Sequence, residues 1–212
     1  QQHNAAFSRD AAVDARQTAS VRLAHALAAI QAETDPRERE AILLAVINDL
    51  AAQEIPLALA VLQSADPSGF TADLSARLIR RWAENDARTA AAWVEELPSG
   101  SLRQEALSGV AVEWANREPS EAETWARQLP QETEQQQALS VVASEFIRTD
   151  PLEALRLITD LPPDARRDEL ARQAAMEWAS QDGGSAARWA RQIEGGPLRD
   201  QVLAAIATAW SE

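Results

Sequence analysis

The sequence predicts an all-α protein, a solenoid of about six antiparallel helix pairs. The first observation is a period of 32 residues, at which apolar residues return without an insertion. Two series keep this step: Trp82, Trp114, Phe146, Trp178 and Trp210, and Val61, Trp93, Trp125, Leu157 and Trp189. A fixed period of about 20–50 residues is typical of repeat proteins, whose stacked units bury one continuous core. The second observation is that no stretch alternates polar and apolar residues as a half-buried strand does.

The first helix of each repeat begins at an acidic residue, from which we count positions. These heads are Glu54, Asp86, Glu118, Asp150 and Asp182. Alanine stands at position 4 in every copy: Ala58, Ala90, Ala122, Ala154 and Ala186. Because positions 4, 7 and 11 lie on one face of a helix, they predict a buried stripe. The acid is placed to cap the helix, less well when it is Glu.

Prolines mark both ends of this first helix. Pro119 and Pro151 directly follow their acidic heads and occupy the first helical position, where a missing N–H is tolerated. Pro98, Pro130 and Pro162 stand about ten residues later and stop the helix. The sequence therefore predicts a first helix of about ten residues in each repeat.

The second helix is longer and carries apolar residues at positions 20, 21, 24, 25 and 28. In the repeat headed by Asp86 these are Ala106, Leu107, Val110, Ala111 and Trp114. A less regular repeat precedes them, with Pro36 and an apolar stripe that ends at Leu50. We therefore predict a single helical-repeat domain over residues 22–212, with units starting near 22, 54, 86, 118, 150 and 182. Residues 1–21 are expected to form an N-terminal tail and a capping extension of the first helix.

Composition bounds the partners and the compartment. The net charge of −13 argues against nucleic acid and anionic membrane surfaces, which require clustered cations. No Cys is present, which excludes disulfides, thiolate metal sites and Cys nucleophiles. No apolar run approaches the roughly 20 residues of a membrane-spanning helix, so direct membrane insertion is not expected. The chain begins with Gln1 rather than Met; either a signal peptide or anchor was removed, or the sequence was trimmed. We expect a periplasmic or secreted protein, with the cytoplasm as the alternative.

The residue types needed for catalysis are sparse. The two His residues, His3 and His25, have no metal-ligand spacing, and no G-x-S-x-G turn occurs. The many pairs of acidic residues are typical of solvated helix faces. We therefore expect no enzymatic activity, no cofactor and no metal.

The repeats resemble those of the tetratricopeptide family, which often shows D-P-x-x-A-x-x-W at the start of its first helix. The matching residues are Glu118, Pro119, Ala122 and Trp125 in one repeat, and Asp150, Pro151, Ala154 and Leu157 in the next. The chain departs from the family in its period of 32 rather than 34 residues, in its lack of Tyr and in the L-P stop after the first helix. The resemblance implies a right-handed superhelix whose concave face, lined by first helices, binds a protein segment.

Outward positions 6, 9 and 10 of the first helices are the candidate partner-binding positions. They change from acidic to basic along the chain: Glu95 and Glu96, then Arg127, Arg156, Arg188 and Arg191. Since arginine forks bind carboxylates, an acidic peptide or a chain terminus is the expected ligand. The alternative is that these arginines are ordinary surface residues paired with neighbouring acids.

Trp210 is the remaining candidate. Aromatic residues on an apolar stripe are most simply core residues, but no later repeat is present to cover Trp210. Either the full protein continues beyond this sequence, or Trp210 is partly exposed and able to receive a partner or a second copy. The leading expectation is a non-catalytic scaffold or adaptor for a protein partner, possibly one subunit of a larger assembly. The alternative is a self-associating structural rod or spacer; recognition of RNA by the repeats is a third possibility, which the net charge disfavours.

Overall fold

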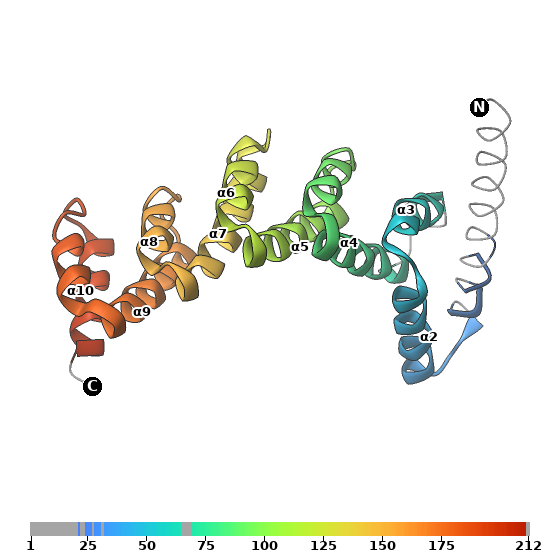
Figure 1. Ribbon diagram of the computed structural model, residues 1–212, viewed down its shortest axis with the longest axis horizontal. Coiled ribbons are helices and arrows are strands. Elements are labelled where there is room, and N and C mark those ends of the chain that lie inside the picture. Colours follow the sequence, from blue (N-terminus) through green and yellow to red (C-terminus); the bar gives the residue numbers. More distant parts are fainter. Residues whose placement is uncertain (1–20, 22–23, 27, 31, 65–68, 211–212) are drawn as a thin grey trace, which may run out of the picture. The chain divides into compact units, whose positions relative to one another are not determined.

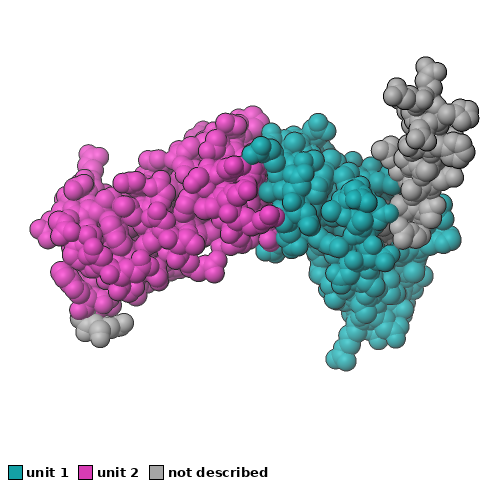
Figure 2. Space-filling model, in the orientation of Figure 1, with its two compact units in different colours: residues 1–106 teal, residues 107–212 magenta. Residues whose placement is uncertain are grey.

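The protein is described by a computed structural model over residues 21–210, except residues 22–23, 27, 31 and 65–68. The chain divides into two compact units, residues 1–106 and residues 107–212 (Figure 2). The boundary between them lies inside helix α5, Ser101–Arg117. Each unit is described here by itself, and the N-terminal tail expected over residues 1–21 lies almost wholly outside the described residues.

Between residue 36 and the start of α5, the described part of the first unit forms α-helices and one short 3-10 helix (Figure 1). They are α2 (Pro36–Asp49), η1 (Ala52–Glu54), α3 (Ile55–Ser64) and α4 (Gly69–Glu95). The largest buried side chains, among them Ile55, Leu59 and Leu78, come from α3 and α4. The core of this unit therefore lies where the predicted apolar stripes of neighbouring helices meet.

The second unit continues the same alternation of shorter and longer helices (Figure 1). Its helices are α6 (Pro119–Gln128), α7 (Glu132–Thr149), α8 (Pro151–Thr159), α9 (Ala165–Ala190) and α10 (Pro197–Trp210). Each helix packs on its neighbours in sequence, from α6 on α7 through to α9 on α10. Where the structure describes the chain, it holds helices and no strand, which confirms the predicted all-α fold of stacked helix pairs.

Adjacent repeats are joined by a single non-helical residue. Asp150 separates α7 from α8 with φ −147° and ψ 81°. Asp86 inside α4 and Asp182 inside α9 have nearly the same angles, −147° and 81°, and −150° and 81°. Each of these long helices is therefore a second helix and the following first helix, bent at the predicted acidic head.

The predicted helix caps are confirmed where the head is aspartate. A carboxylate oxygen of Asp86, Asp150 or Asp182 accepts a hydrogen bond from the amide three residues on, at 3.1, 3.0 and 2.9 Å. Glu118 makes no such bond, although Pro119 follows it at the first helical position as predicted. The extra methylene of glutamate carries its carboxylate past the amides at the helix start, so that helix relies on proline alone.

The predicted stripe of alanines forms the closest helix contacts. Ala58, Ala90, Ala122, Ala154 and Ala186 are all buried, each with 0–1% of its surface exposed. A larger side chain at position 4 would force neighbouring helices apart, because packed helices lie about 8–10 Å from each other.

The aromatic residues pack in pairs across consecutive repeats. Tryptophan at position 28 meets tryptophan at position 7 of the next repeat, eleven residues later in the sequence. The ring centroids are 6.4 Å apart in Trp82–Trp93, 5.5 Å in Trp114–Trp125 and 5.8 Å in Trp178–Trp189. Between the last two pairs, Phe146 and Leu157 hold the same positions and are both buried.

Among the described residues, no single helix is long and apolar enough to span a membrane. Only one pair of helical segments, Pro36–Asp49 and Ala52–Gln63, reaches that length and composition when taken together, and the two are bent by 104°.

Candidate partner-binding face

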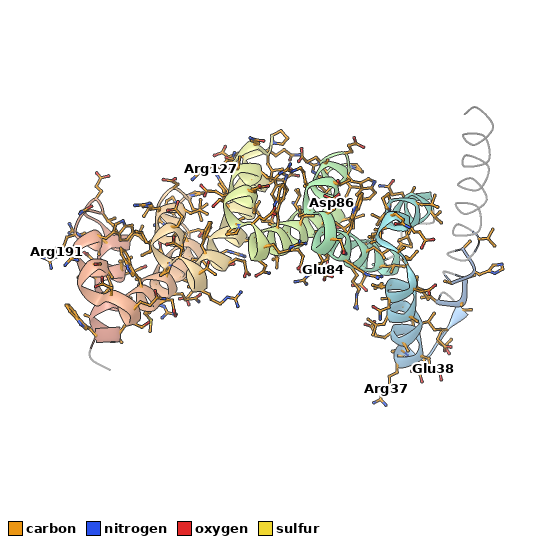
Figure 3. All side chains as sticks on the ribbon, viewed as in Figure 1. Arg37, Glu38, Glu84, Asp86, Arg127 and Arg191 are labelled. Atoms are coloured by element: carbon orange, nitrogen blue, oxygen red, sulfur yellow. The ribbon has the colours of Figure 1, made fainter. Side chains whose placement is uncertain are left out.

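Arg127 is exposed near the end of α6 (Figure 3), and its positive charge is balanced by two carboxylates. Its guanidinium pairs with Glu123 on the same helix at 2.8 Å and with Asp160 at the end of α8 at 3.2 Å. The hydrogen bond to Glu123 raises the pKa of Arg127, and the bond to Asp160 adds to that effect. The contact with Asp160 links consecutive repeats, but an exposed ion pair of this kind contributes at most about 1 kcal/mol.

The other three predicted arginines are also exposed. Arg156 on α8 pairs with Glu153 at 3.0 Å. Arg188 donates to the hydroxyl of Ser185 at 2.8 Å, and Arg191 has no recorded ion pair in the described part of the chain and lies at the end of α9 (Figure 3). Arg127 and Arg156 thus fit the alternative interpretation, in which surface arginines pair with neighbouring acids. Arg188 and Arg191 have no such ion pair in the described part of the chain.

Glu95 and Glu96 are exposed at the end of α4, in the first compact unit. The four arginines all belong to the second unit. The candidate site is therefore built from the second unit alone.

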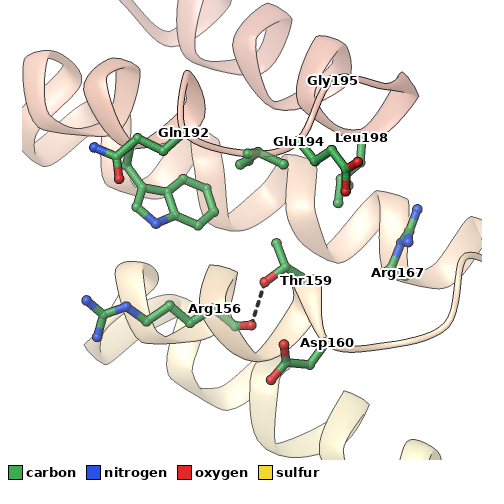
Figure 4. Close-up of a pocket in the computed structure, with 10 residues that line it drawn as sticks. Arg156, Thr159, Asp160, Arg167, Gln192, Glu194, Gly195 and Leu198 are labelled. Atoms are coloured by element: carbon green, nitrogen blue, oxygen red, sulfur yellow. Dashed lines mark hydrogen bonds between the residues drawn. The ribbon is translucent and has the colours of Figure 1, made fainter.

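A hollow of about 680 Å³ opens between the end of α8 and the turn from α9 to α10 (Figure 4). It is lined by Arg156, Thr159, Asp160, Arg167, Trp189, Gln192, Ile193, Glu194, Gly195 and Leu198. Four of these residues, Arg156, Thr159, Asp160 and Gln192, hold the outward positions 6, 9 and 10 that the sequence marked as candidate binding positions. The structure therefore brings two consecutive first helices together around one hollow.

The lining of the hollow is mixed in charge, with an apolar wall. Arg156 and Arg167 lie at opposite ends of the hollow in Figure 4, while Asp160 and Glu194 supply two carboxylates. Trp189, Ile193 and Leu198 provide apolar surface. Because the charges balance, the hollow favours no simple anion. It offers donors and acceptors around a place for an apolar side chain, as binding pockets commonly do.

Arg167 lines this hollow because it does not donate to the backbone at the end of the preceding helix, as residues at the same position of other repeats do. At the same position, 17, Arg103 is buried and its Nη1 donates to the backbone carbonyls of Val94, Glu95 and Leu97. Arg39 donates to the carbonyl of Glu33 and Gln135 to that of Arg127 in the same way. These side chains satisfy carbonyls at the end of a first helix, which a helix otherwise leaves unpaired. Arg167 instead pairs with Asp168 at 2.8 Å.

The sequence contained the signal for this capping role, namely a long donor side chain recurring at position 17. From the sequence alone, the recurring arginine suggested only an ion pair or a stem that covers the loop. The ion pair is what Arg167 forms, whereas Arg39 and Arg103 donate to the backbone. An adjacent acid does not decide this alone, because Arg39 is followed by Glu40 and still donates to a backbone carbonyl, while Glu40 pairs with Arg77.

Trp210 is exposed over 66% of its surface. One side of its ring rests on Gly183, where an added methyl group would stand 3.2 Å from Cε2. No second aromatic ring packs on Trp210 among the residues that the structure describes.

No group of three His, Cys, Asp or Glu side chains with metal-binding geometry occurs within the described ranges. No family model, no curated protein and no solved structure matches this chain.

Proposed function

We propose that the protein is a non-catalytic interaction scaffold that binds an extended segment of a protein partner along the face lined by its first helices. The observation that carries this proposal is the hollow between α8 and the α9–α10 turn. It lies at the outward positions of two consecutive first helices and combines an apolar wall with polar groups of both kinds. The likeness of the repeats to the tetratricopeptide family supports the same function, since that family binds protein segments.

The mixed lining refines the ligand expected from the sequence. An acidic peptide or a chain terminus would meet Arg191, and Arg188 with the Asp182 carboxylate nearby, but would also meet Asp160 and Glu194 in the hollow. A segment with one large apolar side chain, flanked by backbone amides and one or two acids, suits both regions. The apolar side chain would enter beside Trp189 and Ile193, and its flanking amides would exchange hydrogen bonds with the polar rim.

Selection of a random peptide library on the immobilised chain tests this proposal. We expect enriched peptides to share a large apolar residue near an acid. Thr159→Arg fills the hollow from its rim and should weaken the selected peptides at least tenfold, whereas Thr133→Arg, at an exposed position of α7, should leave them unchanged.

A second variant tests the basic residues, one of which, Arg156, also lines the hollow. Replacing Arg127, Arg156, Arg188 and Arg191 together by Ala should weaken binding and reduce its dependence on salt, because exposed charges act through screened attraction. Replacing the exposed, ion-paired Arg148 and Arg172 of α7 and α9 is the matched control. The proposal would be contradicted if the selected peptides bound both the Thr159→Arg variant and the fourfold variant as tightly as they bind the wild-type protein.

A further inference from the structure

A second surface, on α10, is independent of the hollow and goes beyond the proposed function. In the repeats before it, three positions of the second helix, 21, 25 and 28, form a stripe. In α5 these are Leu107, Ala111 and Trp114, and all three are buried. In α7 they are Leu139, Ala143 and Phe146, and all three are buried as well.

The stripe of α9 belongs to the same series. Ala171 and Ala175 are buried, and Trp178 packs on Trp189 of the following first helix. Across the second unit, the stripe at positions 21, 25 and 28 is therefore the surface on which one repeat receives the next. Its residues are spaced by four and three, so they lie on one face of the helix.

On α10 the equivalent residues are Leu203, Ala207 and Trp210. Leu203 is half-buried, Ala207 is exposed and Trp210 is 66% exposed. The opposite face of α10 packs normally, since Val202, Ala205 and Ile206 are buried. The helix is thus seated on α9, and its outer stripe is the one part of the pattern that no described residue covers.

The position of the Trp210 ring is set by the protein. Gly183 leaves no room for a side chain beneath it, because a methyl group there would stand 3.2 Å from the ring. The equivalent positions in the two preceding repeats hold Pro119 and Pro151. One side of the indole therefore has a fixed support, and the other side is open, as Trp114 and Trp178 would be without their partners.

We propose that the stripe of Leu203, Ala207 and Trp210 is a docking site for a helix of the repeat's own kind. This ligand is an amphipathic helix that carries a small residue followed three positions later by an aromatic residue. The proposal rests on continuity with an interface that recurs within the chain. There, Trp125 or Trp189 of the first helix packs on the aromatic residue of the preceding stripe, and Ala122 and Ala186, three residues earlier, are buried.

Because the chain has no Cys, a single thiol can report whether the stripe is covered. The probe is a peptide of residues 118–149, which contains one complete helix pair with Ala122 and Trp125. We expect this peptide to slow maleimide labelling of the full chain carrying Ala207→Cys at least tenfold. Labelling of Gln201→Cys, exposed on the side of α10 that faces α9, should change less than twofold.

A tethered form covers the case in which the free peptide does not fold. In this form, one linker residue and a copy of residues 118–149 are fused after residue 212. The added Glu118 then stands four residues after Trp210, just as Glu118 stands four residues after Trp114. The same slowing is expected, and it should be lost when Trp125 of the added segment is replaced by Ala.

Unchanged labelling of Ala207→Cys in the tethered form would overturn the proposal. So would slowing that grows with protein concentration in the absence of the peptide, because it would place a second copy of the chain on the stripe. Neither readout depends on the hollow beside Thr159, so this proposal and the proposed function can fail separately.

Discussion

The turn that follows the first helix differs between the repeat headed by Asp86 and the repeat headed by Asp150. The two helices begin alike, since both aspartates cap with the same backbone angles. They end differently: Arg103 is 4% exposed and holds three backbone carbonyls, whereas Arg167 pairs with Asp168 and lines a hollow. An arginine at the same position thus serves as a structural cap in one repeat and borders a candidate binding site in another.

The adjacent residue gives a physical reason for this difference where it has no other partner; Glu40 beside Arg39 pairs with Arg77 instead, and Arg39 donates to a backbone carbonyl. Gln104 follows Arg103 and carries no charge, so the guanidinium is free to reach the carbonyls of the helix end. Asp168 follows Arg167 and draws the guanidinium to its carboxylate, with the Nε and Nη2 atoms 3.1 and 2.8 Å from one oxygen. The last repeat also has an aspartate directly after this arginine: Nε of Arg199 lies 3.7 Å from Oδ1 of Asp200.

The largest effect should come from removing the buried cap. Arg103→Ala removes the side-chain donor from the carbonyls of Val94, Glu95 and Leu97, although the Val94 carbonyl keeps the backbone N–H of Leu97. We expect a loss of about 2–3 kcal/mol in the free energy of unfolding of the first unit. Arg167→Ala should cost about 1 kcal/mol or less, since it removes a pair near the surface.

Urea unfolding combined with hydrogen exchange at the amides around residues 94–97 measures both changes. Arg103→Gln is the control, because Gln135 performs the same capping with an amide in the next repeat. Equal losses for Arg103→Ala and Arg167→Ala would show that the two turns do not differ energetically.

The two helix starts should respond equally to mutation. Asp86→Ala and Asp150→Ala each remove a cap to the amide three residues on, and each should cost about 1 kcal/mol. Thermal unfolding of the two variants would check this equality. If the two losses differed by much more than about 1 kcal/mol, the caps at Asp86 and Asp150 would not be energetically equivalent.

Asp168→Gln should make the second turn resemble the first. With its carboxylate removed, Arg167 is expected to donate to the carbonyls at the end of α8 and stabilise the second unit by about 0.5–1.5 kcal/mol. Nitrogen-15 spectra of the arginine Nε–H group would report its new hydrogen bonds. An unchanged Arg167 signal would show that packing, rather than Asp168, directs this side chain.

The smallest effect is a dependence on pH at Asp86. A hydrogen bond from the Thr89 hydroxyl, with another from its amide, lowers the pKa of Asp86 from its usual 3.8. A lowered folded-state pKa means that the stabilisation is present above the unfolded pKa of about 3.9 and is lost as pH falls through the folded value.

Urea titrations between about pH 5 and pH 2 would show this loss, and Asp86→Asn should reduce it. The corresponding change at Asp150, whose carboxylate has no hydroxyl donor at position 153, serves as the comparison. An Asp86→Asn profile that falls as steeply as that of the wild type would assign the acid sensitivity to other groups.

Several elements followed directly from the sequence. Asp86, Asp150 and Asp182 begin helices, Pro98, Pro130 and Pro162 follow helix ends, and all five alanines at position 4 are buried. Each of these depends on residues within one helical turn of one another or on a constant period. Spacing along the chain carries that information.

The candidate site was predictable only in outline. Positions 6, 9 and 10 identified Arg156 as facing outward, and Arg156 does line the hollow, together with Asp160 and Gln192. The sequence did not indicate that Arg167 would join them. It offered ion pairs with neighbouring acids as the alternative for the four arginines, and such pairs occur at Arg127, with Glu123 and Asp160, and at Arg156, with Glu153. Asp160 lies in the repeat after that of Arg127, and spacing along the chain does not rank competing partners.

By itself, the sequence determined that this protein is a stack of helix pairs with a 32-residue period. It also determined that aspartates cap the first helices and that these helices carry a buried stripe of alanines. Those properties repeat because each depends on local spacing that is the same in every copy. Only the tertiary structure decided that Arg103 caps while Arg167 lines a hollow, and that Arg127 pairs with Asp160 of the next repeat. The reason is that the burial and partners of a repeated residue depend on its neighbours in space, which differ from copy to copy.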